Sequence, residues 1–481
     1  MYDPSRWGLP PEAVAQLANR LGLFWSRFQP CFKTRTRNTS DRAYDYLRGQ
    51  LTMDTRRNFA NMARTLNGAD GQALQHFMSN SPWSSQTVFR QIQAEIKTSR
   101  LPTQGNTLIL DESADEKAGT HNAGASRQYN GRMGKVDLCR VDTCLAYANA
   151  SIGLWALVDG ELFLPQAWFG EDLAQVGQAL GLPEERHFET KLQLGLKMLK
   201  RAKASGLPFE LLACDTFYGR DRQFRANLDA EGVVYAAQVP ADTRVYLREP
   251  RVGVPQKGSH RGRHPTRLKV LSRDKPHEVR ALARSLKTQW QRVQVRHTER
   301  GLLQEDFAVL RVWTVAQGQK PRAEWLVIRR ESGGQCWYTL LNAPEDTPKP
   351  TLIDFSCRRY FCERTIEDAK TEIGWDEFCA QKYLAWEHHL ALTALALWFV
   401  AQSKLEWRQS YERDPELAHQ LAVEVLPALS TANVRELLKA ALPLPQLTPE
   451  QATQLVITHL VHRARSTSSR LKSQGTPFDS S

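Results

Sequence analysis

The order of apolar segments between residues 105 and 240 restricts the fold of this chain more than any other feature. Three strand-like runs come first, and afterwards amphipathic helical stretches alternate with short apolar runs. The strand-like runs cover residues 106–111, 135–149, 150–165, 209–215 and 233–240, and the helical stretches cover residues 184–206 and 221–232. Strands joined by short turns pair antiparallel, whereas strands joined by helical crossovers run parallel, so this order predicts one mixed sheet.

The same element order distinguishes between kinds of α/β fold. A dinucleotide-binding fold would alternate strand and helix from its first strand, and the chain has neither a G-x-G-x-x-G after a strand nor a P-loop. Three meander strands followed by helix, strand, helix and strand are typical of a ribonuclease-H-like sheet. We therefore predict the α/β class, with a ribonuclease-H-like mixed sheet, a β-rich insertion and helical N- and C-terminal regions.

Positive charge is concentrated in one segment of the chain. The 481 residues carry 64 Lys and Arg against 52 Asp and Glu, a formal net charge of +12. Residues 248–300 alone hold 15 Lys or Arg and four Asp or Glu, which accounts for nearly the whole excess. A charged run is often only a solvated face, but an excess confined to one segment favours a surface that binds the phosphates of a polyanion. Its candidate contacts are Lys257, Arg261, Arg263 and Arg267.

These patterns divide the chain into five expected regions. Arginines are frequent among the short helical patterns of the first hundred residues, which suits a DNA-binding domain. We expect residues 1–100 to form this helical domain, 101–240 the first part of the ribonuclease-H-like core, 241–350 a basic β-rich insertion, 351–403 the second part of the core, and 404–481 a C-terminal helical region with a disordered tail.

Composition also bears on the compartment. The longest apolar run, residues 389–400, is shorter than the ~20 residues that a membrane span needs, and it predicts a buried helix. The N-terminus shows no secretory signal pattern, and the eight cysteines include no C-x-x-C pair. We therefore expect a cytoplasmic protein without a membrane partner, a zinc site or a disulfide framework.

Two aspartates follow apolar runs whose strands would be neighbours. Asp111 comes directly after the first predicted strand's apolar run, and Asp215 after that of the fourth. In a ribonuclease-H-like sheet these strands lie side by side, so the two carboxylates converge. A carboxylate buried there needs a cation, although an aspartate at a strand end also serves as a turn or capping residue. Glu112 is the alternative to Asp111, but it would point to the opposite face of the strand.

A third carboxylate comes from a predicted helix after the insertion. Arg359, Glu363, Glu367 and Lys370 follow one another at spacings of four, four and three residues, which places them on one helix face. The same spacing fits a solvated stripe of ion pairs, and Glu367 is the alternative to Glu363 as a ligand. Three carboxylates without clustered His or Cys favour Mg²⁺, with Mn²⁺ as a substitute, over zinc.

Taken together, these motifs resemble those of the DDE transposases of bacterial insertion sequences. Asp111 in LILDES, Asp215 in ACDTFYG and Glu363 in RRYFCERTIEDAK resemble the three acidic motifs of that family. The run KAGTHNAGASRQYNGRMGKVD also resembles the stretch after the first acid in one insertion-sequence group. The resemblance covers roughly residues 105–400.

One branch of the family carries Tyr-x2-Arg-x3-Glu-x6-Lys around its third acid. Arg359, Glu363 and Lys370 match the last three members of this signature. The tyrosine position holds Ser356, so the tyrosine's part would fall to a neighbour such as Tyr360.

The resemblance implies a transposase that binds terminal inverted repeats, cleaves them and joins the ends to target DNA. Two Mg²⁺ ions would be held by Asp111, Asp215 and Glu363, and Arg359 and Lys370 would contact phosphates. Residues 1–100 would bind the transposon ends, and double-stranded DNA would be held by a homodimer. Two alternatives stay open: a ribonuclease-H-fold nuclease without strand transfer, and a domesticated DNA-binding protein that has lost catalysis.

Overall fold

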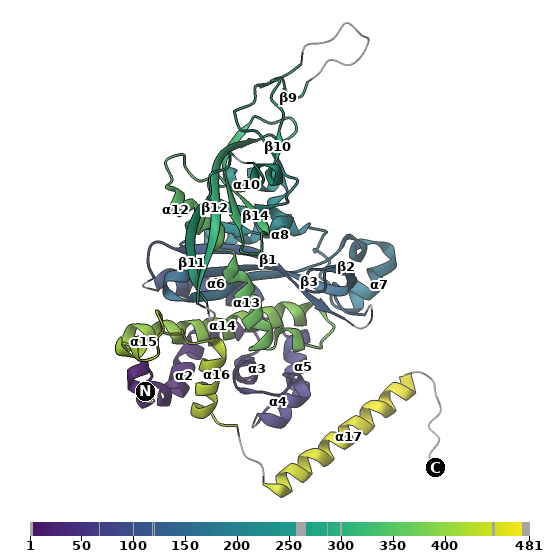
Figure 1. Cartoon of the computed structure of the whole chain (residues 1–481). Coiled ribbons are helices and arrows are strands. Elements are labelled where there is room, and N and C mark those ends of the chain that lie inside the picture. Colours follow the sequence, from purple (N-terminus) through teal and green to yellow (C-terminus); the bar gives the residue numbers. More distant parts are fainter. Residues whose placement is uncertain are drawn as a thin grey trace.

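A ten-stranded sheet flanked by helices forms the centre of the molecule (Figure 1). The computed structural model describes residues 3–66, 68–99, 101–117, 119, 121–255, 266–285, 287–298, 301–444 and 448–473. The strands follow the order β11-β12-β13-β14-β6-β5-β1-β3-β2, and β4 also pairs with β3.

Five strands form the predicted core of this sheet. They are β1 (Asn106–Glu116), β3 (Lys135–Asn149), β4 (Leu154–Phe163), β5 (Leu211–Cys214) and β6 (Tyr235–Val239). β3 pairs antiparallel with both β1 and β4, whereas β5 runs parallel to both β1 and β6. The crossovers contain α8 (Lys191–Ala204), and then α9 (Thr216–Gly219) with α10 (Arg222–Ala230). The predicted mixed α/β sheet is therefore confirmed.

Three local predictions differ from the structure. β1 does not end at Asp111 but continues to Glu116, because the long strand β3 offers pairing partners as far as Cys139. An unpredicted strand, β2 (Ser126–Asn130), pairs with the start of β3. The helix expected from residue 184 begins at Lys191, because Thr190 and Gln193 form a capping box that fixes its first turn.

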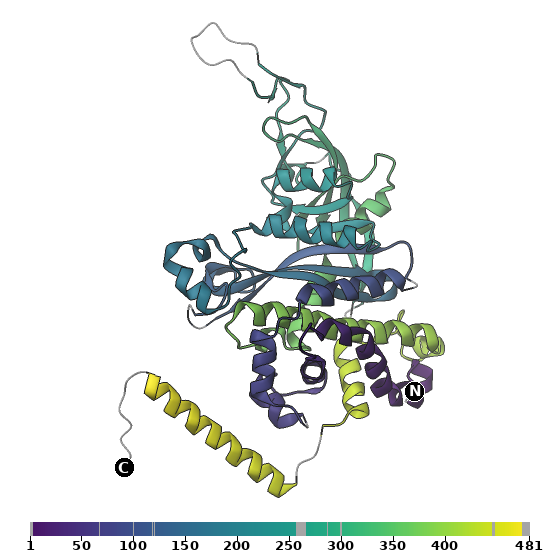
Figure 2. The same cartoon turned by 180° about the vertical axis from the view of Figure 1, so that it is seen from behind.

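The insertion extends the same sheet and does not build a separate one. Its long strands are β11 (Gln291–Thr298), β12 (Gly301–Thr314), β13 (Arg322–Arg330) and β14 (Cys336–Leu341), and β14 pairs antiparallel with β6. Shorter elements complete it, namely β7 (Arg244–Val245), β8 (Val252–Gly253), β9 (Lys269–Val270), β10 (His277–Glu278) and α11 (Val279–Ala283). The insertion rises from the core as an elongated arm (Figures 1 and 2).

A buried ion pair joins this arm to the core. Arg225 of α10 and Glu324 of β13 lie 3.2 Å apart with side chains 2% and 0% exposed. The Tyr235 hydroxyl of β6 donates a hydrogen bond to the same carboxylate at 2.5 Å. Because breaking this pair would leave an unpaired charge in the protein interior, the pair stabilises the contact between the arm and the parallel strands of the sheet.

Helices from both ends of the chain pack together beneath the sheet. The N-terminal set comprises α1 (Pro11–Ala15), α2 (Leu17–Phe28), α3 (Ser40–Thr52), α4 (Phe59–Thr65), α5 (Gly71–Asn80) and α6 (Ser85–Thr98). The later set comprises α13 (Tyr360–Thr371), α14 (Tyr383–Ser410), α15 (Glu416–Gln420) and α16 (Thr431–Ala441). Outside this bundle, α7 (Glu171–Ala179) follows β4, α12 (Lys349–Cys357) contacts β12 and β13 of the insertion, and α17 (Pro449–Ser473) follows α16. α3, α5, α6 and α16 contact α14, and their apolar residues share one core with the sheet.

The long helix α14 is the core helix that the sequence predicts. Within the described residues it alone is apolar and long enough for a membrane span, but 94% of its most apolar stretch is buried inside the protein. The expected boundaries at residues 350/351 and 403/404 lie inside α12 and α14. α17 stands apart from the other helices in both views, and the expected disordered tail after it lies outside the described residues (Figures 1 and 2).

Candidate active site

The register between β1 and β5 places two predicted acids next to each other. Leu110 pairs with Cys214 in the parallel ladder, so the following residues, Asp111 and Asp215, occupy adjacent positions on neighbouring strands. Asp215 leaves β5 as the N-cap of α9, where its carboxylate accepts backbone N–H hydrogen bonds from Phe217 at 3.0 Å and from the next residue. Two N–H donors fix this carboxylate beside Asp111.

The third acid joins them through an arginine. Arg359 precedes α13, and its guanidinium donates to the Asp111 carboxylate at 2.8 Å and also to the Glu363 carboxylate. The side chains of Arg359 and Asp111 are 18% and 15% exposed, whereas that of Glu363 is 56% exposed. The structure therefore brings Asp111 and Glu363 to one guanidinium, with Asp215 beside Asp111, and the site is most exposed at Glu363.

Burial dominates the electrostatics of the aspartate pair. It raises the pKa of Asp111 to about 7, with the Asp215 charge adding to the rise and Arg359 opposing it. Burial likewise raises the pKa of Asp215, against the two backbone N–H donors and Arg359. Two buried carboxylates that repel each other need a nearby cation in order to ionise fully.

Glu112, the alternative first ligand, faces another helix. Its carboxylate forms an ion pair with Lys191 of α8 at 2.5 Å, whereas Asp111 contacts Arg359 at the start of α13. Alternation along a strand accounts for this difference between consecutive residues. The geometry favours Asp111 over Glu112 as the partner of Glu363, and the assignment of roles stays a prediction.

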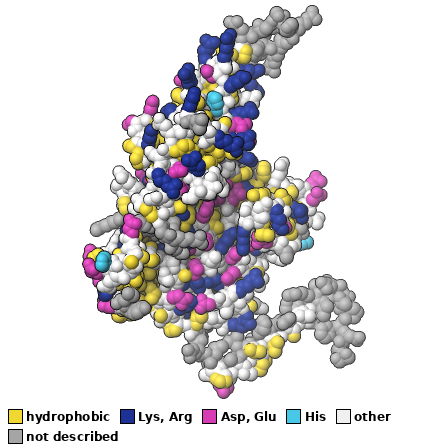
Figure 3. All heavy atoms as spheres, in the orientation of Figure 1, with side chains coloured by type: hydrophobic (Ala, Val, Ile, Leu, Met, Phe, Trp, Pro, Cys, Tyr) yellow, Lys and Arg dark blue, Asp and Glu magenta, His cyan; other side chains and the backbone are white. Residues whose placement is uncertain are grey.

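The residues predicted to contact DNA are placed in three different ways. Arg359 is engaged with the acids, and the Lys370 ammonium donates to the Ala114 carbonyl at 2.9 Å. Arg267 is exposed on the insertion. The remaining three, Lys257, Arg261 and Arg263, lie outside the described residues. Figure 3 shows Lys and Arg side chains along the described upper part of the arm.

Two contacts near the site were not predicted from the sequence. Lys191 supplies a second cation, which pairs with Glu112 and whose charge opposes the rise that burial causes in the pKa of Asp215. Arg296 of β11 lies over the Tyr360 ring, 3.3 Å from its centroid, so an insertion strand reaches the start of α13. The amphipathic pattern of residues 184–206 predicted the helix of Lys191, but no signal linked either basic residue to the acids.

The donor set suits a hard divalent cation. Within the described ranges, no three His, Cys, Asp or Glu side chains stand close enough together to hold an ion. Arg359 lies between Asp111 and Glu363 and supplies the compensating charge. Carboxylate oxygens are the ligands that Mg²⁺ and Mn²⁺ prefer, so Asp111, Asp215 and Glu363 have the donor chemistry of such a site.

Comparison with known proteins places this site in context. A family model described as DDE superfamily endonuclease matches residues 27–302, which include Asp111 and Asp215 but end before Glu363. The chain is also 22% identical over 345 residues to a probable transposase for insertion sequence element IS701 from Microchaete diplosiphon. This alignment covers 71% of the chain and 77% of that relative.

Proposed function

The chain belongs to the family of DDE superfamily endonucleases, and from this premise we propose that it is a DNA transposase. It binds the terminal inverted repeats of its element, cleaves there and joins the ends to target DNA. The observation that carries this proposal is the placement of Asp215 beside Asp111, together with the guanidinium that joins Asp111 to Glu363. The resemblance of the chain to a probable insertion-sequence transposase supports it.

The acids would serve phosphoryl transfer. Asp111, Asp215 and Glu363 would hold two Mg²⁺ ions, which would supply Lewis-acid polarisation of the scissile phosphate and a more acidic water or 3′-hydroxyl as the nucleophile. Burial keeps the two aspartates in a fixed geometry, and the backbone N–H groups of α9 prevent Asp215 from rotating away. Because the Glu363 side chain is exposed, DNA enters the site from the side of Glu363. Arg359 then exchanges its carboxylate contacts for a phosphate flanking the scissile bond.

The rest of the chain would hold the DNA. Lys and Arg residues of the arm, Arg267 among them, bind the duplex, and the helices of residues 1–100 bind the transposon ends. Tyr360, stacked under Arg296, takes the place of the signature tyrosine. Two copies hold two ends in a synaptic complex, with the C-terminal helices as their interface. Because its substrate is chromosomal DNA, we place the protein in the cytoplasm with the nucleoid.

A single reaction tests this proposal. The purified protein is incubated with Mg²⁺, a target plasmid and DNA that carries the sequences flanking its own reading frame. We expect cleavage at the ends and a joined product in the plasmid. Cleavage without joining would instead identify a nuclease, and binding without cleavage would identify a domesticated DNA-binding protein.

A further inference from the structure

The hairpin of β2 and β3 exposes apolar side chains to solvent. Tyr129 and Val136 pair directly across the two strands, and they are 62% and 55% exposed. Met133, in the turn between them, is 49% exposed. Apolar side chains gathered on one exposed element mark a contact surface, whereas single ones do not. The hairpin lies in the run KAGTHNAGASRQYNGRMGKVD, to which the proposed function gives no role.

The turn of this hairpin is held in one conformation. Asn130 is fully buried, and its side-chain oxygen accepts backbone N–H hydrogen bonds from Arg132 at 3.0 Å and from Met133 at 3.4 Å. Its amide donates to the Glu116 carboxylate of β1 at 2.9 Å. The side chains at the tip therefore project from a fixed backbone, and less conformational entropy is lost when they bind a partner.

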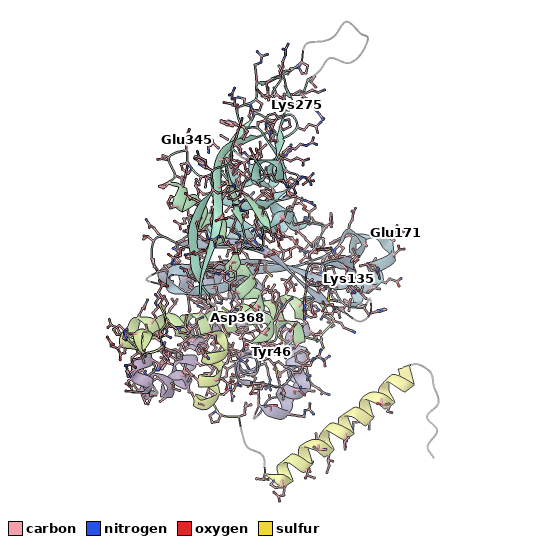
Figure 4. All side chains as sticks on the ribbon, viewed as in Figure 1. Tyr46, Lys135, Glu171, Lys275, Glu345 and Asp368 are labelled. Atoms are coloured by element: carbon pink, nitrogen blue, oxygen red, sulfur yellow. The ribbon has the colours of Figure 1, made fainter. Side chains whose placement is uncertain are left out.

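The exposed pair lies on the face of the sheet that carries the first acid. Asp111 pairs with Cys144 of β3, and Val136 lies eight residues before Cys144 on the same strand. Because side chains alternate along a strand, Val136 and Cys144 share one face with their direct partners, Tyr129 and Asp111. At about 3.4 Å per residue, Val136 is about 27 Å from Cys144 along the strand. In Figure 4, Lys135 marks this end of β3, which lies to the side of the arm.

Positive charge surrounds these apolar groups. Residues 126–136 contain three basic residues and no acidic one. Arg127 is exposed on the face of the apolar pair, and the Arg132 side chain is 57% exposed, with two long ion pairs at 3.6 Å and 3.9 Å. Asp137 faces the other side of the sheet and is paired with Lys135 at 3.1 Å. Basic side chains around apolar ones suit DNA, whose phosphates are anionic and whose sugars and base edges accept apolar contacts.

The dimensions of the hairpin and of a B-form duplex agree. The major groove is about 12 Å wide and admits a two-stranded β-ribbon. Base pairs follow one another at about 3.4 Å along the axis, so a distance of about 27 Å corresponds to about 8 base pairs. A straight duplex with its scissile phosphate at the acids therefore reaches the hairpin about 8 base pairs away.

We propose that the β2–β3 hairpin enters the major groove of the bound duplex about 8 base pairs from the scissile phosphate. Arg127 and Arg132 bind backbone phosphates, and Tyr129, Met133 and Val136 pack against sugars and base edges. The inference rests on the proposed function, since that function places the scissile phosphate at the acids. It adds a contact that neither the arm nor the N-terminal helices provide. The groove belongs either to the end of the element or to the DNA that flanks it.

Methylation interference measures this contact, because methylation of guanine N7 modifies the major groove. The probe is DNA that carries the sequences flanking the protein's own reading frame, bound in EDTA so that it is not cut. With the unchanged protein, methylation about 8 base pairs from the end of the element should weaken binding. In Tyr129→Ser and Arg132→Gln this interference should disappear. The side of the element's end on which it falls shows which of the two duplexes the hairpin holds.

The dependence of affinity on salt separates the parts played by the two side chains. Arg132→Gln should reduce the slope of log affinity against log salt by about 0.9. Tyr129→Ser should weaken binding about tenfold and leave the slope unchanged, because it removes apolar contact and no charge. Lys200→Gln is the matched control, since the Lys200 side chain is 62% exposed and pairs with Glu231 at 3.4 Å on α8, the helix that covers the opposite face of the sheet. It should change neither affinity nor slope.

Two results would overturn the inference. One is an interference pattern and a salt slope that stay unchanged in both hairpin variants. The other is an altered oligomeric state of DNA-free Tyr129→Ser together with an unchanged slope in Arg132→Gln, which would assign the hairpin to a contact with a second copy. Arg127→Gln, for which the same reduction in slope is expected, serves if Arg132→Gln does not fold. Interference without cleavage when Mg²⁺ is added to the unchanged protein would count against the proposed function alone.

Discussion

The ion pair between Arg359 and Asp111 makes a prediction about stability that depends on pH. The perturbation is Arg359→Gln, which removes the cation beside the buried carboxylate and leaves the backbone of α13 unchanged. In the unchanged protein the pKa of Asp111 is about 7, well above the ordinary value of 3.8. The folded state therefore retains this proton up to about pH 7, and the free energy of unfolding falls as the pH rises from about 4 to about 7.

The magnitude follows from the pKa shift. An arginine beside a carboxylate lowers its pKa by about 1–3 units, so the variant's Asp111 should titrate at about pH 8 or above. At pH 6 Asp111 is protonated in both proteins, and the variant loses mainly the exposed contact with Glu363, about 0.3–0.5 kcal/mol. At pH 8.5 Asp111 is ionised in the unchanged protein and more protonated in the variant, which adds about 1–2 kcal/mol to the variant's loss of stability.

Urea denaturation at pH 6 and pH 8.5, without DNA and with EDTA, measures this difference. Arg364→Gln is the matched control on the same helix, because Arg364 pairs with the exposed Glu367 at 2.8 Å and with Asp368 at 3.6 Å but not with Asp111 or Asp215. Its effect should be equal at the two pH values. Equal destabilisation by Arg359→Gln at both pH values would refute the proposed coupling between Arg359 and the aspartate pair.

Three further predictions concern the scaffold of the site. Glu324→Gln leaves the guanidinium of Arg225 buried without its counter-charge and should lower the free energy of unfolding by about 3–5 kcal/mol in chemical denaturation. A loss below about 1 kcal/mol would contradict the role of this ion pair in holding the arm. Gly219→Ala would bring a Cβ to 1.9 Å from a backbone oxygen of β6 and should destabilise strongly, whereas Gly22→Ala, with open space around it, should stabilise α2 by up to about 1 kcal/mol in the same assay. Burial lowers the pKa of His389 to about 3, so the unfolded state takes up a proton at a higher pH than the folded state does, and the free energy of unfolding falls as the pH drops below 6.5. His389→Gln should reduce this fall by about 2 kcal/mol between pH 7 and pH 4.5. An unchanged pH profile of the variant would show that His389 does not cause the fall.

The sequence predicted the arrangement of the first two acids because strand order alone determines it. Crossover helices make β5 parallel to β1, and the parallel register then brings Asp215 beside Asp111. The third acid was predicted from its spacing to basic residues, and the structure brings Glu363 to the same guanidinium as Asp111. Their catalytic roles stay a prediction.

Side-chain directions could not be predicted in the same way. Helical periodicity placed Arg359 and Lys370 on the face of Glu363, but whether they face DNA or β1 depends on which strand edge α13 covers. The edge that α13 covers depends on how far β1 extends, which is to Glu116, and on the end of β5 at Cys214. The pairing of the insertion with β6 also depends on a contact between segments far apart in the chain, which local patterns do not encode.

The central claim is that Asp111, Asp215 and Glu363 together cleave DNA. Single-turnover cleavage of transposon-end DNA, with binding measured in parallel, tests it for Asp111→Asn, Asp215→Asn and Glu363→Gln. Each change should reduce the cleavage rate at least about 10²-fold while DNA is still bound, because each removes a ligand of the ions that stabilise the transition state. Glu367→Gln, one turn further along α13, should cleave normally. Full cleavage by any of the three acid variants would contradict the account.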